Sequence, residues 1–156
     1  MGKKWRGESG LTLIELIVAF TILSLLTAMA VPMAKMKVRR EKERELRWAL
    51  REIRTAIDKY KDAKDANKLG PVELGTDGWP KTLEVLVEGE KASGQIEGKV
   101  RFLRRIPKDP FTNSTDWGLR SSFDDPKSTT WGGQNVFDVY TKTTEKAADG
   151  TPYSEW

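Results

Sequence analysis

Hydrophobic and polar positions divide the chain into an apolar stretch, a charged stretch with a narrow apolar seam, and a mainly polar remainder. Residues 16–34 contain no charged side chain. At the rise of an α-helix these 19 residues span about 28 Å, close to the roughly 30 Å hydrocarbon thickness of a bilayer. The pattern therefore predicts a helix that is able to cross a membrane.

The charged stretch, residues 39–69, is rich in helix-forming residues and contains neither proline nor glycine. Large apolar residues recur in it at spacings of four, three, four and three, at Leu46, Leu50, Ile53, Ile57 and Tyr60. This spacing predicts one apolar seam on a helix, which we expect to pack on a sheet of the same chain. The predicted helix runs from Leu11 to about Asp65, on the order of 80 Å. Trp48 lies off the seam and is expected at the surface.

The polar remainder begins with a loop at Gly70 and predicts short elements. A short helix is expected with Pro80 at its start and one apolar face formed by Leu83, Leu86 and Val87. The runs 116–123 and 135–143 are typical of strands. We expect them to form a small antiparallel sheet on the seam, with apolar side chains from Val136, Phe137, Val139 and Tyr140. The predicted fold class is α+β.

Composition excludes most familiar catalytic sites. The chain has no cysteine and no histidine, which removes disulfides, thiol nucleophiles, and thiolate or imidazole metal ligands. No motif organises the remaining Asp, Glu, Lys, Ser and Tyr residues into a catalytic set, so we predict that the protein is not an enzyme. The net charge is +4, but the densest basic cluster, residues 101–105, is short, which argues against nucleic-acid binding.

Glu15 is a carboxylate inside the otherwise uncharged run 9–26. A charge at the centre of a membrane helix costs about 2.5 to 3.5 kcal/mol on insertion scales, and less near an end. A secretory signal, with a small-x-small cleavage site at residues 28–30, leaves this carboxylate unexplained, and so does a plain membrane anchor. Basic residues flank the run on both sides, so charge alone does not fix its orientation.

A third interpretation accounts for Glu15. The sequence SG followed by LTLIE, residues 9–15, resembles the processing site of type IV prepilins and type II secretion pseudopilins. The resemblance implies that a prepilin peptidase cuts after Gly10 and N-methylates Leu11, where most of the family has phenylalanine. It also implies that Glu15 meets the terminal amine of a neighbouring subunit. Pro32 stands at the offset where pilin-like helices melt during assembly.

Two further segments resemble the major pseudopilin of type II secretion. One is Trp79-Pro80 followed by Leu83, and the other runs from Leu103 through Ile-Pro-x-Asp-Pro to Phe111. The resemblance implies a type IV pilin-like fold, a long N-terminal helix with a small antiparallel sheet on its C-terminal half. It divides the chain into a leader (1–10), a transmembrane and assembly half-helix (11–34), an amphipathic half-helix (35–69) and a globular head (70–156).

The implied function is that of a structural subunit of a pseudopilus, which polymerises through its N-terminal helix to push folded proteins across the outer membrane. Implied partners are copies of the chain itself, minor pseudopilins, the prepilin peptidase, an inner-membrane assembly platform and the secretion ATPase. The implied location is the bacterial inner membrane, crossed once, with the C-terminal domain in the periplasm. A minor pilin, a pilin of a type IV pilus and a membrane-tethered binding module remain alternatives.

The family often binds calcium in a Gly/Asp-rich loop near the C-terminus, and the resemblance makes Ca²⁺ the one candidate cofactor. The corresponding loop is shorter here, and between Tyr140 and Trp156 its carboxylates are Glu145, Asp149 and Glu155. We predict a calcium site centred on Asp149, although Asp-Gly is equally typical of an ordinary turn. Other carboxylates that could contribute are Asp124, Asp125 and Asp138.

Overall fold

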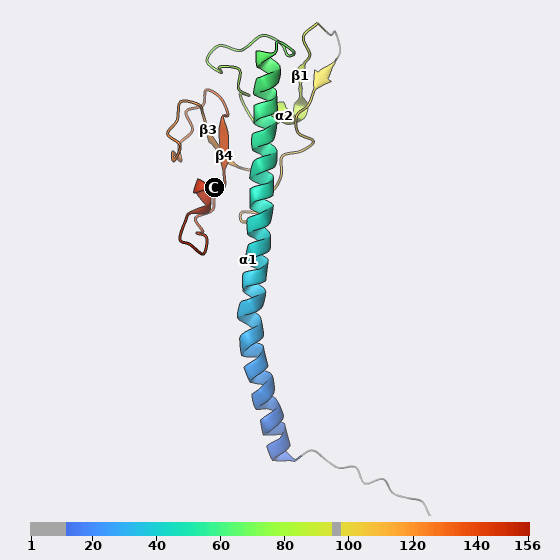
Figure 1. Ribbon diagram of the computed structural model, residues 1–156, viewed down its shortest axis with the longest axis vertical. Coiled ribbons are helices and arrows are strands. Elements are labelled where there is room, and N and C mark those ends of the chain that lie inside the picture. The colour runs from blue at the N-terminus through green and yellow to red at the C-terminus, as the bar shows by residue number, and fades with distance from the viewer. Residues whose placement is uncertain (1–11, 95–97) are drawn as a thin grey trace, which may run out of the picture. The chain divides into compact units, whose positions relative to one another are not determined.

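The computed structural model describes residues 12–94 and 98–156 (Figure 1). The predicted leader, including Gly10, and the predicted new terminus at Leu11 lie outside the described residues. Contacts divide the chain into two units, Met1–Glu41 and Lys42–Trp156, which are described separately below. The domain boundaries predicted at residues 10, 34 and 69 stay predictions.

Helix α1 (Leu13–Asp65) ends where the sequence predicts. Its C-terminus is closed by two backbone hydrogen bonds, from Lys68 N–H to Ala63 O (2.9 Å) and from Asn67 N–H to Lys64 O (3.0 Å). Asn67 has a left-handed φ of 54°, a conformation that asparagine adopts more readily than most residues. This arrangement satisfies carbonyls that would otherwise be unpaired at the helix end.

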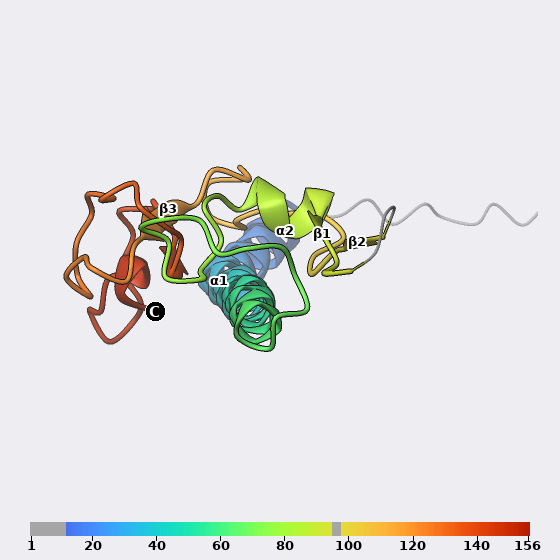
Figure 2. The same ribbon diagram turned by 90° about the horizontal axis from the view of Figure 1, so that it is seen from above.

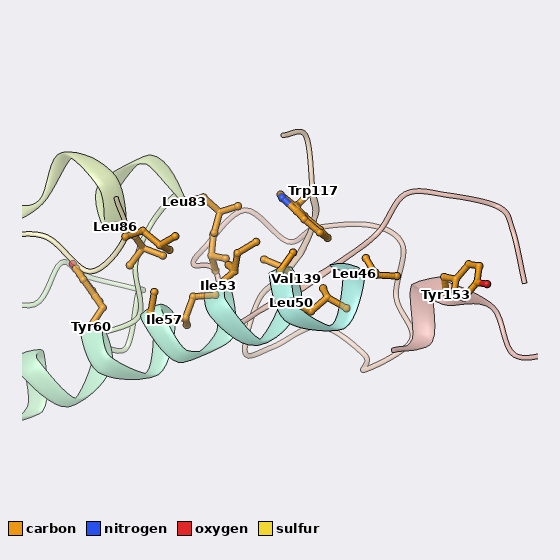
Figure 3. Packing of buried hydrophobic residues seen from close by; sticks show 14 of the residues in the cluster. Leu46, Leu50, Ile53, Ile57, Tyr60, Leu83, Leu86, Trp117, Val139 and Tyr153 are labelled. Atoms are coloured by element: carbon orange, nitrogen blue, oxygen red, sulfur yellow. The ribbon is translucent and has the colours of Figure 1, made fainter. Parts of the chain in front are cut away.

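The apolar seam forms the core of the second unit, as predicted. Its five side chains are all buried: Leu46, Leu50, Ile53, Ile57 and Tyr60. Figure 3 shows them facing residues that come from the rest of the unit, among them Leu83, Leu86, Trp117 and Val139. Trp48 lies off the seam and is 63 % exposed, also as predicted. The seam therefore packs against residues from throughout the second unit. This unit, Lys42–Trp156, is called the head below.

The sheet differs from the single one predicted, because there are two small antiparallel pairs. β3 (Gly118–Arg120) pairs with β4 (Asp138–Tyr140), inside the two runs that the sequence predicts as strands. β1 (Glu90–Lys91) pairs with β2 (Lys99–Val100), and this pair was not predicted. Within the second unit, the two pairs lie on different sides of α1 (Figures 1 and 2).

The register of β3 and β4 depends on a glycine. Gly118 lies opposite Tyr140, and a Cβ at residue 118 would stand only 2.2 Å from the tyrosine ring. Of the four apolar side chains predicted for this sheet, Val136, Val139 and Tyr140 are buried. Phe137 is 47 % exposed and meets Trp79 edge-on, with ring centroids 4.9 Å apart.

The predicted short helix begins later than expected. Helix α2 spans Glu84–Glu88, whereas the sequence pattern placed its start at Pro80. The carbonyl of Pro80 accepts the N–H of Val136 (2.7 Å), so it anchors the chain before β4 and does not start the helix. Leu83 and Leu86 are buried as predicted. The last regular element is the 3₁₀-helix η1 (Tyr153–Glu155).

Candidate functional site

The N-terminal part of α1 exposes nearly all of its large apolar side chains. Leu13 is 78 % exposed, Phe20 72 % and Met33 68 %. Among the described residues, one helix, α1, includes a stretch long and apolar enough to cross a membrane. An apolar surface of this size is covered in a functioning protein by lipid or by other protein.

The polar side chains in this stretch include two threonines that bond within the helix. Thr21 donates its hydroxyl to Ile17 O (2.7 Å), and Thr27 donates to Leu23 O (2.8 Å). Such bonds to the carbonyl four residues earlier let a hydroxyl lie in an apolar environment without an unsatisfied donor. These two threonines therefore add little to the cost of burying the segment.

Glu15 stands in a different situation. It occupies the third helical position after Thr12, whose hydroxyl accepts the Glu15 N–H (3.4 Å). The spacing Thr12-x-x-Glu15 is that of a capping box, and the positive end of the helix dipole favours a carboxylate there. Among the described residues, no side chain forms a hydrogen bond or ion pair with the Glu15 carboxylate. Its predicted partner, the amine of a processed Leu11, lies outside the described residues.

Pro32 lies inside α1, which is helical on both sides of it. Proline lacks the N–H that would bond the carbonyl of Ala28, so the helix has one hydrogen bond fewer at this point. The described structure is helical through Pro32, and local melting there stays a prediction.

At the other end of α1, Lys64 is a buried cation that the sequence analysis missed. Its side chain is 3 % exposed, and its ammonium donates to Gly70 O (3.0 Å), Pro71 O (3.0 Å) and the Glu90 carboxylate. The second oxygen of Glu90 accepts the hydroxyl of Tyr60. Lys64 comes four residues after Tyr60, so the seam spacing already marked its position.

Arg54 is a second residue that the sequence analysis missed. Its guanidinium donates to the Asp138 carboxylate (2.7 Å), to Val139 O (3.2 Å) and to Trp156 O (2.7 Å). Asp138 also pairs with Arg120 (3.4 Å), so this candidate calcium ligand is already bound by two guanidinium groups. One arginine of α1 thus holds both β4 and the last residue of the chain.

Tyr153 fixes the C-terminal segment to the head. It is fully buried, and its hydroxyl hydrogen-bonds the Glu43 carboxylate (2.7 Å). Its ring packs against Phe111 (centroids 4.3 Å apart) and edge-on against Trp156 (4.7 Å). Tyr153 therefore connects η1 to the start of the head half of α1.

Asp149 lies in an exposed turn with Gly150, whose φ is 88°. Its carboxylate accepts the Thr151 N–H (2.9 Å). Hydrogen bonds from the backbone and the side chain of Thr151 lower the pKa of Asp149. Within residues 12–94 and 98–156, no group of three or more carboxylates lies together. Calcium takes six to eight oxygen ligands. The described donors do not form a complete calcium site, and calcium binding at Asp149 stays a prediction.

Asp124 is also engaged by the backbone. Its carboxylate accepts the N–H groups of Ser121 (2.7 Å) and Gly132 (3.1 Å) and so closes the base of the β3–β4 loop. These two bonds lower the pKa of Asp124. Its described role is therefore to shape a loop.

Comparison with known proteins agrees with the N-terminal pattern. The family model described as a prokaryotic N-terminal methylation motif matches residues 5–31, which include Gly10, Leu11 and Glu15. The type II secretion system core protein G of Pseudomonas aeruginosa is 29 % identical over 127 residues, covering 76 % of this chain and 81 % of that protein. No solved structure matches the chain. The chain therefore carries an N-terminal methylation motif and is similar, over most of its length, to a type II secretion system core protein G.

Proposed function

We propose that the chain is a pseudopilin, a structural subunit of a type II secretion pseudopilus that polymerises through its N-terminal helix. The observation that carries this proposal is the exposed apolar segment of α1, with Glu15 unpartnered among the described residues near its start. The likeness to core protein G extends over most of the chain, and this favours the secretion subunit over a pilin of a type IV pilus.

In the proposed sequence of events, the subunit is first processed at its N-terminus. A prepilin peptidase cuts after Gly10 and methylates Leu11, and the subunit waits in the inner membrane with residues 42–156 in the periplasm. In the proposed transmembrane segment, residues 11–34, Glu15 is the one carboxylate. It stands near the end of the helix, where a charge costs less than at the centre, so the segment is stable in the bilayer.

Assembly then gives Glu15 a partner. Inside a filament core, a carboxylate without a cation is costly. The amine of a neighbouring Leu11, four residues from Glu15 in the sequence, supplies the cation and fixes the axial register between subunits. The exposed apolar side chains of α1 pack together and exchange lipid for protein.

The proposed role is mechanical and not enzymatic. The growing rod pushes folded proteins through the outer membrane, while the secretion ATPase and the inner-membrane assembly platform provide the energy and the site of addition. Minor pseudopilins complete the filament. This chain supplies the repeated unit.

The proposal is tested in cells that carry the matching peptidase and secretion system. We expect the intact mass of membrane-extracted protein to correspond to a chain starting at methylated Leu11. We expect Glu15→Ala to be processed normally but to form no filaments, because the neighbouring amine loses its counter-ion. The matched control is Glu45→Ala, which removes an exposed carboxylate from the head half of α1 and leaves filaments intact.

Two outcomes would contradict the proposal. A mature chain that starts at Val31 would mean conventional signal cleavage and the loss of the assembly segment. Normal filaments from Glu15→Ala would show that the carboxylate has no part in register or assembly.

A further inference from the structure

The outward face of α1 in the head carries an exposed aromatic side chain among cations. Trp48 is 63 % exposed. Arg47, one residue before it, and Arg51, three residues after it, are also exposed. Two open grooves adjoin this face. One, about 470 Å³, is lined by Arg47, Arg51, Arg54, Asp58 and Trp156 among others, and the second, about 310 Å³, by Trp48, Arg51, Lys59 and Phe102 among others.

The charge of the larger groove is not balanced within the chain. Asp58 is the one acidic side chain lining it, against three guanidinium groups, and in the smaller groove Glu52 stands against Arg51 and Lys59. Arg54 is neutralised by Asp138, and Arg47 stacks on the Trp156 ring at 4.1 Å. Arg51, which lines both grooves, has no hydrogen bond or ion pair with any described residue. The surface therefore suits an acidic segment that also presents an aromatic side chain.

The chain contains such a segment in the loop between β3 and β4. Phe123 is 63 % exposed and is followed directly by Asp124 and Asp125. Asp124 accepts two backbone N–H groups, which lower its pKa. Asp125 is exposed, with one oxygen accepting the Lys127 N–H (2.8 Å). In Figure 2 this loop, drawn in orange, projects to the side, away from α1. It is thus presented outward, where a second copy can reach it.

We propose that the Phe123–Asp125 loop of one subunit docks on the Trp48–Arg51 face of the next subunit in the filament. This inference rests on the proposed polymerisation. The contact joins two different patches, so it repeats head to tail, and it gives an open helical filament where the rotation between copies does not close into a ring. Because the charges are exposed, the contact is weak and sensitive to salt. It sets the angular position of each head while α1 drives assembly.

The absence of cysteine from the chain makes a direct test available. Thr55 is exposed and lines both grooves, and Pro126 is exposed and directly follows Asp125. Thr55→Cys and Pro126→Cys therefore place one thiol at each proposed patch and keep the Phe123 ring. In filaments of the full chain, we expect the double variant to oxidise into a ladder of linked subunits. Each single variant should give no ladder. The matched control pairs Pro126→Cys with Leu74→Cys, a fully exposed position outside the proposed patch, and should also give none.

Charge reversal tests the electrostatic part. In the double-cysteine background, we expect Arg51→Glu to abolish the ladder, and Arg51→Glu combined with Asp125→Arg to restore it. Arg51→Lys should keep it, because the charge is retained. Filament formation by electron microscopy is the independent readout. Filaments without a ladder overturn this inference and leave the proposed function standing, whereas a chain that forms no filaments overturns both.

Discussion

Lys64 shows at the residue scale how a charged side chain can occupy a core position. Its ammonium has three acceptors, the carbonyls of Gly70 and Pro71 and the carboxylate of Glu90, so every donor is satisfied. A buried ion pair contributes less than its Coulomb energy suggests, because both ions were desolvated. Removal of one partner is nevertheless costly, since the other charge remains. Lys64 thereby ties the last turn of α1 to the segment that follows it.

The first prediction is that Lys64→Met destabilises the head. Glu90 would keep only the Tyr60 hydroxyl, and two carbonyls would lose their donor, which lowers the free energy of unfolding by about 3 kcal/mol. Urea denaturation of the full chain in detergent measures the change. The control is Lys81→Met, which breaks an exposed pair with Glu73 and should cost less than about 1 kcal/mol. Equal losses in the two variants would contradict this account of Lys64.

Tyr60 gives the same cluster a pH dependence. Burial raises the pKa of Tyr60 well above its usual value, and the hydrogen bond and negative charge of Glu90 raise it further. A pKa that is higher in the folded state favours the protonated form there. The resulting stabilisation is fully present below the ordinary tyrosine pKa of about 10 and is lost as pH rises through the folded value.

We therefore predict that the head loses stability above about pH 10 and that Tyr60→Phe removes much of this loss. At neutral pH the same variant should be less stable by about 1 kcal/mol, since the Glu90 hydrogen bond is gone. Urea midpoints between neutral and alkaline pH measure both effects. Tyr140→Phe, which also removes a hydroxyl, should keep the alkaline slope. The prediction is wrong if Tyr60→Phe and the unsubstituted chain lose stability in parallel.

At the scale of elements, the sequence predicts those that carry a repeated pattern. The seam residues Leu46 to Tyr60 identify the buried face of α1, and the helix end at Asp65 agrees with the structure. The β1–β2 pair escapes prediction because a strand of two residues is too short to show alternation. The sequence pattern indicates too early a start for α2, because proline is as typical of the first turn of a helix as of the anchoring role that Pro80 has here.

The candidate functional residues also divide into those that interrupt a sequence pattern and those that do not. Glu15 stands out in the sequence because a carboxylate breaks an apolar run. Arg54 does not, because it lies in a stretch of many charges and its partners are 84 to 102 residues away. Lys64 continues the seam spacing, but a lysine is normally expected at the surface, so the pattern alone does not identify it as buried. Long-range partners of charged residues are what the pattern leaves out.

We predict that the loop around Asp149 binds calcium weakly. One ionised carboxylate with backbone carbonyls corresponds to the weak end of protein calcium sites, with dissociation constants of about 0.1 to 1 mM. We expect millimolar calcium to raise the unfolding temperature of the chelator-treated chain, and Asp149→Asn to remove the rise. The control is Asp77→Asn, which changes an exposed carboxylate in another loop that is not a candidate calcium ligand and should keep the rise. An unchanged unfolding temperature would show that this loop is an ordinary turn.

At the scale of the molecule, the two units have opposite relations to solvent. The described large apolar side chains of the first unit, up to Val38, are exposed, whereas the second unit buries a continuous cluster from Leu46 to Tyr153. Arg54 and Tyr153 link α1 to the C-terminal segment inside the second unit. All the buried residues of the core therefore lie between Lys42 and Trp156.

This distribution predicts that a chain of residues 42–156 folds in water without detergent. It should unfold cooperatively on heating and show a near-ultraviolet circular dichroism spectrum with fixed aromatic side chains, because the core loses no member. A chain of residues 54–156 is the control, since it lacks Leu46, Ala49, Leu50 and Ile53 and should not fold. Loss of each large side chain, Leu46, Leu50 and Ile53, costs roughly 2 to 5 kcal/mol, and together these losses reach the stability of a small domain. Failure of residues 42–156 to fold would mean that the N-terminal part of α1 stabilises the head and does more than anchor and assemble it.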